Sequence, residues 1–274
     1  MIGKLCLRAV NFRLHILGSS SSGNCSLLVT PHARILVDAG LSGRRIEQAL
    51  AKIGESIKDV DAVFITHEHK DHCCGLVGLA RFEHLVFFAN RETQQAIQAS
   101  REKMPGNWKI FETGSCFTFR GVTVSAFSIP HDAADPVGYA FSFGAAVPAW
   151  TVAWVTDLGY VPQLVREKLR HATHLVLEAN YDCGMLDNSG RPPSLKQRIR
   201  GRHGHLSNDL ALELLMTLEN NCLRHVFFGH LSRECNSPEL VSDAMMAVRS
   251  LRPKCTFTVL DPQADCPVSL EESP

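Results

Sequence analysis

One run of seven residues, THEHKDH at positions 66–72, constrains this chain more than any other feature of its sequence. The apolar residues 62–65 precede it and predict a buried strand that stops at Thr66, so that the polar residues share the turn that follows. This turn carries four potential metal ligands, namely His67, His69, Asp71 and His72. Imidazole nitrogens and carboxylate oxygens suit zinc, manganese or iron. The run therefore predicts a metal site at the end of a strand.

Chance is a poor explanation for this run. Histidine makes up about 5% of the chain, so the pattern HxHxDH arises by chance in roughly one chain of this length in a thousand. The run also differs from the helical zinc motif HExxH, because residue 71 is aspartate and no second histidine follows at the required spacing. A solvated turn without metal is the alternative. By itself, the turn supplies too few ligands for two ions.

Further ligand-type residues stand where other apolar runs end. They are Asp38 after residues 35–37, His131 after residues 122–129, Asp157 after residues 151–156, and His230 after residues 225–229. Any one of them alone fits a structural role. Because the ends of neighbouring strands meet at one edge of a sheet, we expect these side chains to converge on the THEHKDH turn.

Strand-like segments alternate with helical segments along the chain. Strands are expected at residues 14–17, 26–29, 35–37, 62–65, 85–89, 122–127, 151–155, 174–177, 225–228 and 256–260. Helices are expected at residues 43–53, 94–101, 161–169, 209–218 and 238–249. The alternation predicts an α/β fold. We expect a single domain over residues 1–261 and a flexible tail over residues 262–274, where the composition is polar and includes proline.

The composition limits the classes of function. The 28 basic and 28 acidic residues balance, so binding of nucleic acid requires a local basic patch rather than a field over the whole protein. The 10 cysteines include no CxxC pair, which favours free thiols in a reducing cytoplasm over a disulfide framework. No apolar stretch reaches about 18 residues, and the N-terminal sequence lacks a signal-peptide pattern. We therefore expect a cytoplasmic protein without a membrane anchor.

The order of these segments resembles the metallo-β-lactamase superfamily. That resemblance implies an αββα four-layer sandwich with a two-metal centre between the sheet edges. Six segments also resemble the narrower WalJ/YycJ group of phosphohydrolases and nucleases: LGSSSSGNCSLLV, ILVDAGLSGRRIEQAL, IPHDAADPVGYAF, VTDLGYV, GRHGHLSN and GHLSRECNSPEL. Together they extend over about residues 14–240.

The resemblance implies how the ligands are divided between two ions. The expected ligands are His67, His69 and His131 for one ion and Asp71, His72 and His230 for the other. Asp157 is expected to bridge the ions, and Asp38 to orient a ligand histidine and fix its tautomer. The expected cofactors are two divalent ions per chain, zinc or manganese, with iron also compatible with these ligands.

The expected chemistry is hydrolysis of a phosphodiester. Two cations a few ångströms apart lower the pKa of a shared water, so a bridging hydroxide exists near neutral pH, and they stabilise the charge that develops on a phosphate. His205, in the segment GHLSN, resembles a histidine of the tRNA-processing nuclease branch and is the expected proton donor to the leaving alkoxide. Its alternative role is to cap the following helix. We expect His205, Asp71 and Asp157 to be catalytic.

Several residues are candidates for contact with substrate. The basic segment at residues 194–205 could follow a nucleic-acid strand, and Arg202 is its representative; a solvated cationic loop is the alternative. The other candidates are Ser22 and Asn24 in the segment GSSSSGN, Asn180, and Arg233 just after His230. A purely structural turn is the alternative for GSSSSGN. Related sequences often carry histidine where this chain has Tyr181, which argues against a catalytic role there.

The function favoured by these observations is a metal-dependent nuclease, in the form of a DNA exonuclease in repair, with DNA favoured over RNA. One alternative is a thioesterase of the glyoxalase II type or another small-molecule hydrolase. A lactamase is disfavoured because position 157 is aspartate where that branch has cysteine. A non-catalytic nucleic-acid-binding scaffold is the third alternative, although such relatives usually lose ligands. The sequence predicts neither the native metal nor the oligomeric state.

Overall fold

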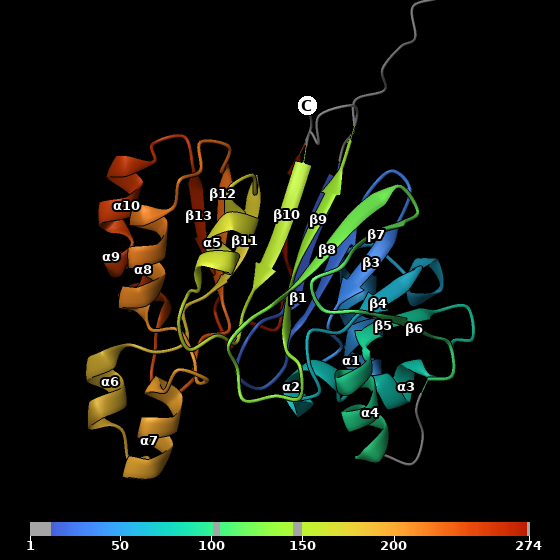
Figure 1. Cartoon of the computed structure of the whole chain (residues 1–274), viewed down its shortest axis with the longest axis horizontal. Coiled ribbons are helices and arrows are strands. Elements are labelled where there is room, and N and C mark those ends of the chain that lie inside the picture. The colour runs from blue at the N-terminus through green and yellow to red at the C-terminus, as the bar shows by residue number, and fades with distance from the viewer. Residues whose placement is uncertain (1–11, 101–104, 145–149, 273–274) are drawn as a thin grey trace, which may run out of the picture.

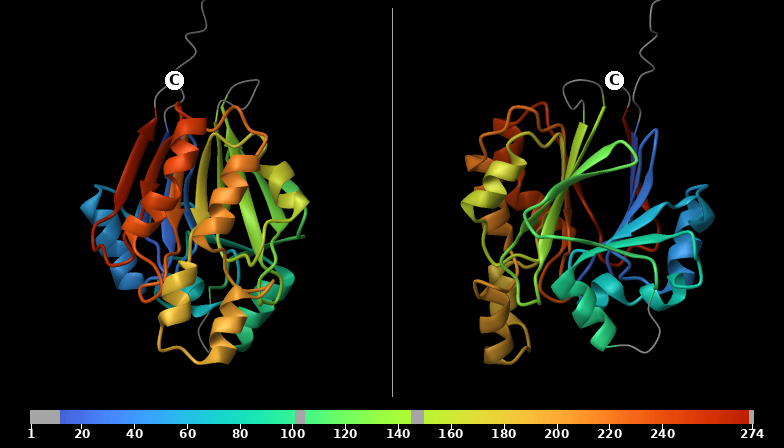
Figure 2. Two further views of the ribbon diagram at one scale, coloured as in Figure 1. Left: turned by 90° about the vertical axis from the view of Figure 1, so that its left-hand side faces the viewer. Right: turned by 45° about the vertical axis from the view of Figure 1, so that its right-hand side comes forward.

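The computed structural model describes residues 12–100, 105–144 and 150–272. These residues form two seven-stranded sheets that lie face to face, with helices on both outer sides (Figure 1 and Figure 2). This arrangement confirms the expected α/β four-layer sandwich. The two sheets share one apolar layer.

The first sheet has the strand order β14-β1-β2-β3-β4-β5-β6. Its strands are β1 (Phe12–Gly18), β2 (Cys25–Val29), β3 (Arg34–Val37), β4 (Ala62–Phe64), β5 (Val86–Asn90), β6 (Trp108–Phe111) and β14 (Val268–Glu272). From β14 to β3 the pairing is antiparallel, and from β3 to β6 it is parallel.

The second sheet has the strand order β13-β12-β11-β10-β9-β8-β7 and a similar division. Its strands are β7 (Cys116–Phe119), β8 (Val122–Ser128), β9 (Val137–Phe143), β10 (Trp150–Val155), β11 (His174–Glu178), β12 (His225–Gly229) and β13 (Thr256–Val259). Strands β10 to β13 are parallel, whereas β7 to β10 are antiparallel. The parallel strands of each sheet therefore bring their C-terminal ends to one edge.

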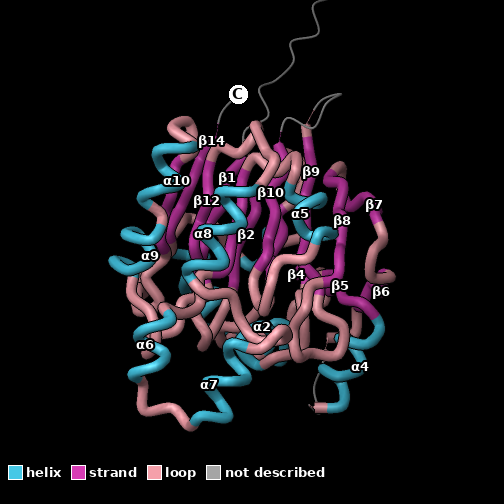
Figure 3. The backbone as a smooth tube through the Cα atoms, turned by 60° about the vertical axis from the view of Figure 1, so that its left-hand side comes forward, coloured by secondary structure: helices cyan, strands magenta, loops and turns pink. Residues whose placement is uncertain are grey.

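Helices cover the outer face of each sheet. Those on the first sheet are α1 (Gly43–Lys52), α3 (Leu76–Leu79) and α4 (Arg91–Ala99). Those on the second sheet are α5 (Gln163–Leu169), α8 (Asn208–Thr217), α9 (Pro238–Ala244) and α10 (Met246–Leu251). Three short helices, α2 (Lys70–Cys73), α6 (Cys183–Asn188) and α7 (Pro193–Arg200), lie at one end of the sandwich (Figure 1 and Figure 3).

Aromatic side chains fill the layer between the sheets. Phe64 stacks on Phe88 with ring centroids 4.3 Å apart, and Tyr139 and Phe141 meet Phe64 edge-on. Strands covered on both faces bury nearly every side chain, which is why β2, β10, β11 and β12 have long apolar runs in the sequence. The rigid double sheet supports the loops that follow its parallel strands.

All ten expected strands and five expected helical segments are present, with one helix divided. The segment at residues 238–249 forms α9 and α10, which meet at Met245. Sequence patterns missed β6, β7 and β9. The short strands β6 and β7 lie at sheet edges and expose about half of their residues, so their apolar signal is weak. In β9, Gly138 interrupts the pattern because a Cβ there would lie 2.6 Å from the Phe127 ring.

The expectation of a flexible tail over residues 262–274 is wrong for residues 268–272. Residues 268–272 form β14, which pairs antiparallel with β1 at the edge of the first sheet. Val268 and Leu270 pack against the core between the sheets. The Ser269 hydroxyl forms a 2.6 Å hydrogen bond with His15 Nδ1. The alternation of only two apolar residues with polar ones is a weak signal. An open edge on β1 supplies the partner that the local sequence does not reveal.

Truncation after residue 267 is expected to lower the stability by about 3 kcal/mol, because it removes one strand ladder and the partial burial of two aliphatic side chains. For a chain of this size, that loss corresponds to a fall in Tm of roughly 6–12 °C. Thermal unfolding followed by circular dichroism measures it. An unchanged Tm would mean that β14 contributes nothing to the folded state.

Within the described residues, no helix has both the length and the apolar character needed to cross a bilayer. The nine cysteines among these residues form no disulfide.

Candidate metal centre

Three polar residues at strand ends adopt a left-handed backbone conformation. Asp38 follows β3, Asp157 follows β10 and His230 follows β12, with φ angles of 61°, 62° and 57°. This conformation costs an L-residue roughly 1–2 kcal/mol, although aspartate and histidine adopt it more readily than most. Strain of this kind that recurs at one edge of a fold is typical of a functional site.

The THEHKDH run follows β4 as the sequence predicts. Its second half forms the single-turn helix α2, in which the backbone N–H groups of His72 and Cys73 donate to the carbonyl of His69. The chain passes tightly here, since a Cβ on Gly40 would lie 1.6 Å from the carbonyl oxygen of Asp71. Only glycine at position 40 therefore allows the loop after β3 to lie against α2.

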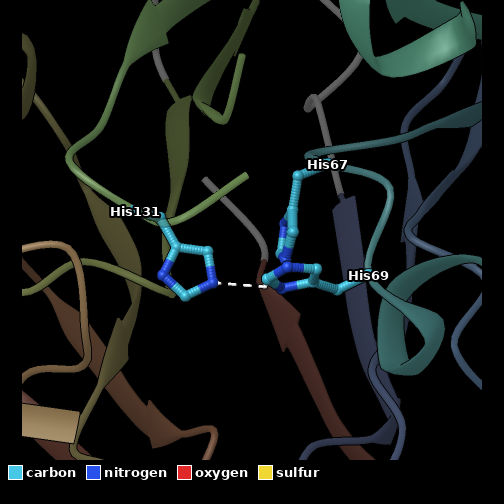
Figure 4. A group of neighbouring side chains, drawn as sticks. All are labelled: His67, His69 and His131. Carbon is cyan, nitrogen blue, oxygen red and sulfur yellow. Dashed lines mark hydrogen bonds between the residues drawn. The ribbon is translucent and has the colours of Figure 1, made fainter. Parts of the chain in front are cut away.

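The first group of donor atoms consists of three histidines (Figure 4). His67, His69 and His131 each offer a ring nitrogen within 4.8 Å of the others, and His69 Nδ1 lies 3.2 Å from His131 Nε2. Nε2 of His67 is buried and has no hydrogen-bond partner among the described residues. Burial, together with the neighbouring His72, holds the pKa of His67 well below its usual value. A neutral, unpaired imidazole is the form that binds a metal ion.

The second group combines imidazoles with carboxylates. Asp71 Oδ2 lies 3.4 Å from His72 Nε2 and 3.3 Å from His230 Nε2. Asp157 approaches the same two nitrogens to 3.2 Å, with Oδ2 near His72 and Oδ1 near His230. Ligand atoms about 2.1 Å from one tetrahedral ion are separated by about 3.4 Å. The nitrogen and oxygen donors of both groups thus fit a site for divalent metal.

Asp157 lies between the two groups. Its carboxylate is within 4.8 Å of donor atoms on His67 and His72 in one direction and on His230 in another. Although burial opposes ionisation, the positive charges of His230 and His72 hold the pKa of Asp157 well below its usual value. An ionised carboxylate in this position has the geometry expected of a bridging ligand.

Asp38 orients His72. Its Oδ2 lies 2.8 Å from His72 Nδ1, while Oδ1 accepts hydrogen bonds from the backbone N–H and the hydroxyl of Thr66. Asp38 thereby favours the tautomer of His72 that carries its proton on Nδ1 and leaves Nε2 for a ligand. Asp38 thus contacts the ligand candidate His72 through its Nδ1.

Glu178, the last residue of β11, is a central residue that the sequence analysis missed. It is fully buried, and its Oε1 lies 2.8 Å from Nδ1 of both His205 and His230. Its Oε2 accepts hydrogen bonds from the backbone N–H groups of Leu158 and Leu206. One carboxylate thus aligns two histidines. Its position after the apolar run LVL is the same signal that identified Asp38 and Asp157.

His205 lies beside the donor groups rather than at a helix cap. Ser207 caps α8, because its side chain accepts a hydrogen bond from Leu210 N, so the capping alternative for His205 is wrong. Burial disfavours the charged form of His205, but the nearby Glu178 and Asp157 carboxylates raise its pKa above the usual value. Since Nδ1 faces Glu178, Nε2 is the ring nitrogen available to a bound molecule.

A cavity of about 260 Å³ opens over the donor groups, and we call it the metal-site cavity. Its walls include ligand candidates, namely His69, Asp71, His131, Asp157 and His230, together with His205 and Asn180. Two guanidinium groups also line it, that of Arg198 from the basic segment expected to contact substrate and that of Arg191, which was not among the expected contacts. Arg198 is paired with Asp132 at 2.6 Å, and Arg191 with Glu234 at 3.0 Å. Both guanidinium groups at this cavity are thus paired with a carboxylate.

Of the expected substrate contacts Ser22, Asn24, Asn180 and Arg233, which lie outside the basic segment, only Asn180 lines this cavity, and its Nδ2 also donates to the carbonyl of His230. Asn24 instead supports the ligands, with Nδ2 3.1 Å from His72 Nε2. Ser22 and Arg233 line a different cavity. The guanidinium of Arg202 lies over the ring of Tyr160 at 4.6 Å.

The basic segment forms a helix rather than the extended strip that the sequence analysis envisaged. Most of it lies in α7, so alternate side chains diverge instead of sharing one face. Arg198 reaches Asp132 beside the metal-site cavity, whereas Arg200 pairs with Asp187. Helix geometry thus selects one arginine of the segment for the cavity and turns another away.

Comparison with known proteins agrees with this geometry. The family model of the beta-lactamase superfamily domain matches residues 33–230. The chain is 36% identical over 269 residues to the exodeoxyribonuclease WalJ of Streptococcus pneumoniae, covering 96% of this chain and 98% of that protein. It is 35% identical over 226 residues to the exodeoxyribonuclease YycJ of Bacillus anthracis, covering 82% of this chain and 84% of that protein.

The fold also matches solved structures. The metallo-β-lactamase fold protein YhfI of Bacillus subtilis superimposes with a TM-score of 0.72 over 96% of this chain and all of that chain, at 14% identity. At that identity the likeness concerns the fold alone. From the family match, the identity over nearly the whole chain and the shared fold, we conclude that this chain belongs to the metallo-β-lactamase superfamily and is related within it to the WalJ and YycJ proteins.

Proposed function

We propose that this chain is a two-metal nuclease that hydrolyses phosphodiester bonds of DNA from an end of the strand. The observation that carries the proposal is the arrangement of two donor groups around Asp157, directly beside a cavity that also holds His205 and two guanidinium groups. The names of the WalJ and YycJ relatives, both exodeoxyribonucleases, support the choice of reaction and substrate.

The ligands are assigned to two ions. His67, His69 and His131 would hold one ion, Asp71, His72 and His230 would hold the other, and Asp157 would contribute to both sites. Bound at these positions, divalent ions supply Lewis acidity and an activated water. Zinc and manganese both accept these ligands. The protein keeps the imidazoles in the required tautomers through Asp38 for His72 and through Glu178 for His230.

His205 delivers the proton that the leaving oxygen requires. Glu178 accepts the hydrogen bond from Nδ1, stabilises the protonated ring and directs Nε2 towards the bound substrate. Arg191 and Arg198 provide donors for the non-bridging oxygens of a phosphate. The two guanidinium groups favour a phosphodiester, whose reacting phosphate carries a negative charge, over the thioester of a glyoxalase-type enzyme, whose reacting carbonyl group is neutral.

End-labelled oligonucleotides test the proposal. Purified protein is expected to contain close to two metal ions per chain, measured by plasma mass spectrometry, and to shorten DNA strands progressively from one end. Activity should disappear with EDTA and return with zinc or manganese. Single- and double-stranded substrates with blocked 5′ or 3′ ends give the polarity. Cleavage of circular DNA would contradict the exonuclease assignment, and hydrolysis of thioesters alone would contradict the nuclease.

Arg198→Ala is expected to raise KM for an oligonucleotide roughly fivefold, because it removes one charge-assisted contact with a phosphate. Arg200→Ala is the matched control, since Arg200 lies on the same helix but does not line the cavity. Steady-state kinetics on a labelled single strand measure both. Equal KM values for the two variants would remove Arg198 from the substrate-binding site.

A further inference from the structure

A second and larger cavity adjoins the metal-site cavity. Its volume is about 770 Å³, and it lies on the other side of the loop at residues 19–23, which we call the serine loop. Its lining includes three cationic side chains, Arg45 and Lys52 from α1 and Arg233 from the loop after β12. Two of the substrate contacts expected from the sequence, Ser22 and Arg233, thus belong to this cavity rather than to the metal-site cavity.

The serine loop contributes residues to the walls of both cavities, and we call it the partition between them. Ser20 and Ser22 line the larger cavity, whereas Ser21 between them lines the metal-site cavity. The loop after β12 repeats this arrangement, with Ser232 in the metal-site cavity and Arg233 in the larger one. Consecutive residues in two separate loops therefore face opposite cavities. The two cavities therefore have residues of the same two loops in their walls.

The partition is fixed to the candidate metal ligands. The hydroxyl oxygen of Ser19 accepts a 2.8 Å hydrogen bond from His230 N. At the other end of the loop, the backbone N–H of Asn24 donates to the carbonyl of Asp71 at 2.8 Å. A molecule held in the larger cavity is therefore held in a defined position relative to the metal centre.

The cations of this cavity retain donors for a ligand. Arg45 lies 3.7 Å from Asp265, but the two side chains are 56% and 88% exposed, so the pair is weak and open to exchange. Lys52 Nζ donates to the backbone carbonyl of Asp265, so in that contact the positive charge of Lys52 is not paired with a carboxylate. Arg233 uses Nε on the carbonyl of Pro262, and its terminal nitrogens remain available. Asp261 and Asp265 are the carboxylates in the lining, so cations predominate.

We infer that the larger cavity, lined by Arg45, Lys52, Arg233 and the serine loop, binds the phosphates of the nucleic-acid strand next to the nucleotide that occupies the metal-site cavity. The inference rests on the proposed function for the identity of the ligand. Phosphate groups at regular intervals along one strand match cations on both sides of the partition. We call this site the strand cavity.

Cysteine footprinting tests the inference directly. Cys266 lines the strand cavity and is exposed, while Cys116 and Cys222 are exposed outside it and serve as internal controls. The metal-loaded full chain is alkylated with iodoacetamide in the presence of a phosphorothioate DNA strand, and each cysteine is quantified by mass spectrometry. A dodecanucleotide is expected to slow alkylation of Cys266 at least roughly fivefold, whereas a single nucleotide, thymidine 5′-monophosphate, which is matched in size to the metal-site cavity, leaves it unchanged.

Three outcomes would overturn the inference. The first is equal alkylation of Cys266 with and without the dodecanucleotide. The second is equal protection of all three cysteines, which indicates nonspecific coating. The third is protection by thymidine 5′-monophosphate as strong as that by the dodecanucleotide. Hydrolysis of bis(p-nitrophenyl) phosphate by the unmodified enzyme is measured in parallel, so a failure of the proposed chemistry is recognised separately from a failure of the strand cavity.

A matched pair of variants provides the second test. Arg45→Ala is expected to raise KM for the dodecanucleotide roughly fivefold and to reduce the slope of log KM against log salt by about 0.7, the value for one phosphate contact with a single strand. Arg44→Ala is the control, because Arg44 is the preceding residue of α1 but lies outside the strand cavity. Equal KM and equal salt slopes for the two variants would overturn the inference.

Discussion

Replacement of Asp157 by asparagine is expected to lower kcat at least a thousandfold, which corresponds to about 4 kcal/mol of transition-state stabilisation. The carboxylate is fully buried between the two donor groups, 3.2 Å from both His72 Nε2 and His230 Nε2. Asparagine preserves the shape of the side chain and tolerates the φ angle of 62° at this position. The substitution therefore removes charge while it preserves the backbone.

Metal content provides a readout for Asp157→Asn that does not depend on substrate. Loss of a shared ligand should reduce the bound metal from about two ions per chain to one or fewer, measured by plasma mass spectrometry after gel filtration. Asp243→Asn is the control, because Asp243 is exposed on α9, away from the donor groups. An Asp157→Asn protein with parental activity and two metals would show that the shared site is assigned wrongly.

The positions of the ligand candidates could be predicted because each stands where an apolar run stops. Asp38, Asp157 and His230 follow strands that are buried on both faces, so their runs are long and their ends are clear. The parallel pairing of these strands then brings the ends to one edge. Such a site can be predicted from sequence, because each ligand directly follows its strand and the parallel pairing brings the strand ends together.

Other features depend on contacts that no local pattern records. Glu178 has the same strand-end signal as Asp157, but its function is set by His205 and His230, which are 27 and 52 residues away. Arg198 faces the metal-site cavity because α7 turns it towards Asp132. If the same segment were an extended strand, alternate side chains would share one face and a different set of residues would be expected at the cavity. β14 forms because β1 has an open edge. Each error arose where tertiary structure decides between local alternatives.

Glu178→Gln is expected to lower kcat roughly ten- to a hundredfold, the usual cost of removing a group that orients ligands and catalytic side chains. Glu178 accepts four hydrogen bonds, two from histidine rings and two from backbone N–H groups. Glutamine replaces one acceptor oxygen with a donor, so at least one of these N–H groups loses its partner. That loss costs about 1–3 kcal/mol of folding stability. Glu213→Gln, at an exposed position on α8, controls for the change of charge.

The pH profile separates positioning by Glu178 from a merely structural role. Burial by itself lowers the pKa of His205, and the Glu178 carboxylate raises it. Without that carboxylate the pKa falls, so the protonated ring that donates to the leaving oxygen is lost at a lower pH. The alkaline limb of the kcat profile should therefore move to lower pH in Glu178→Gln, while KM changes little. A uniform loss of kcat with an unshifted limb would mean that Glu178 only supports the fold, and that the proton comes from a group other than His205.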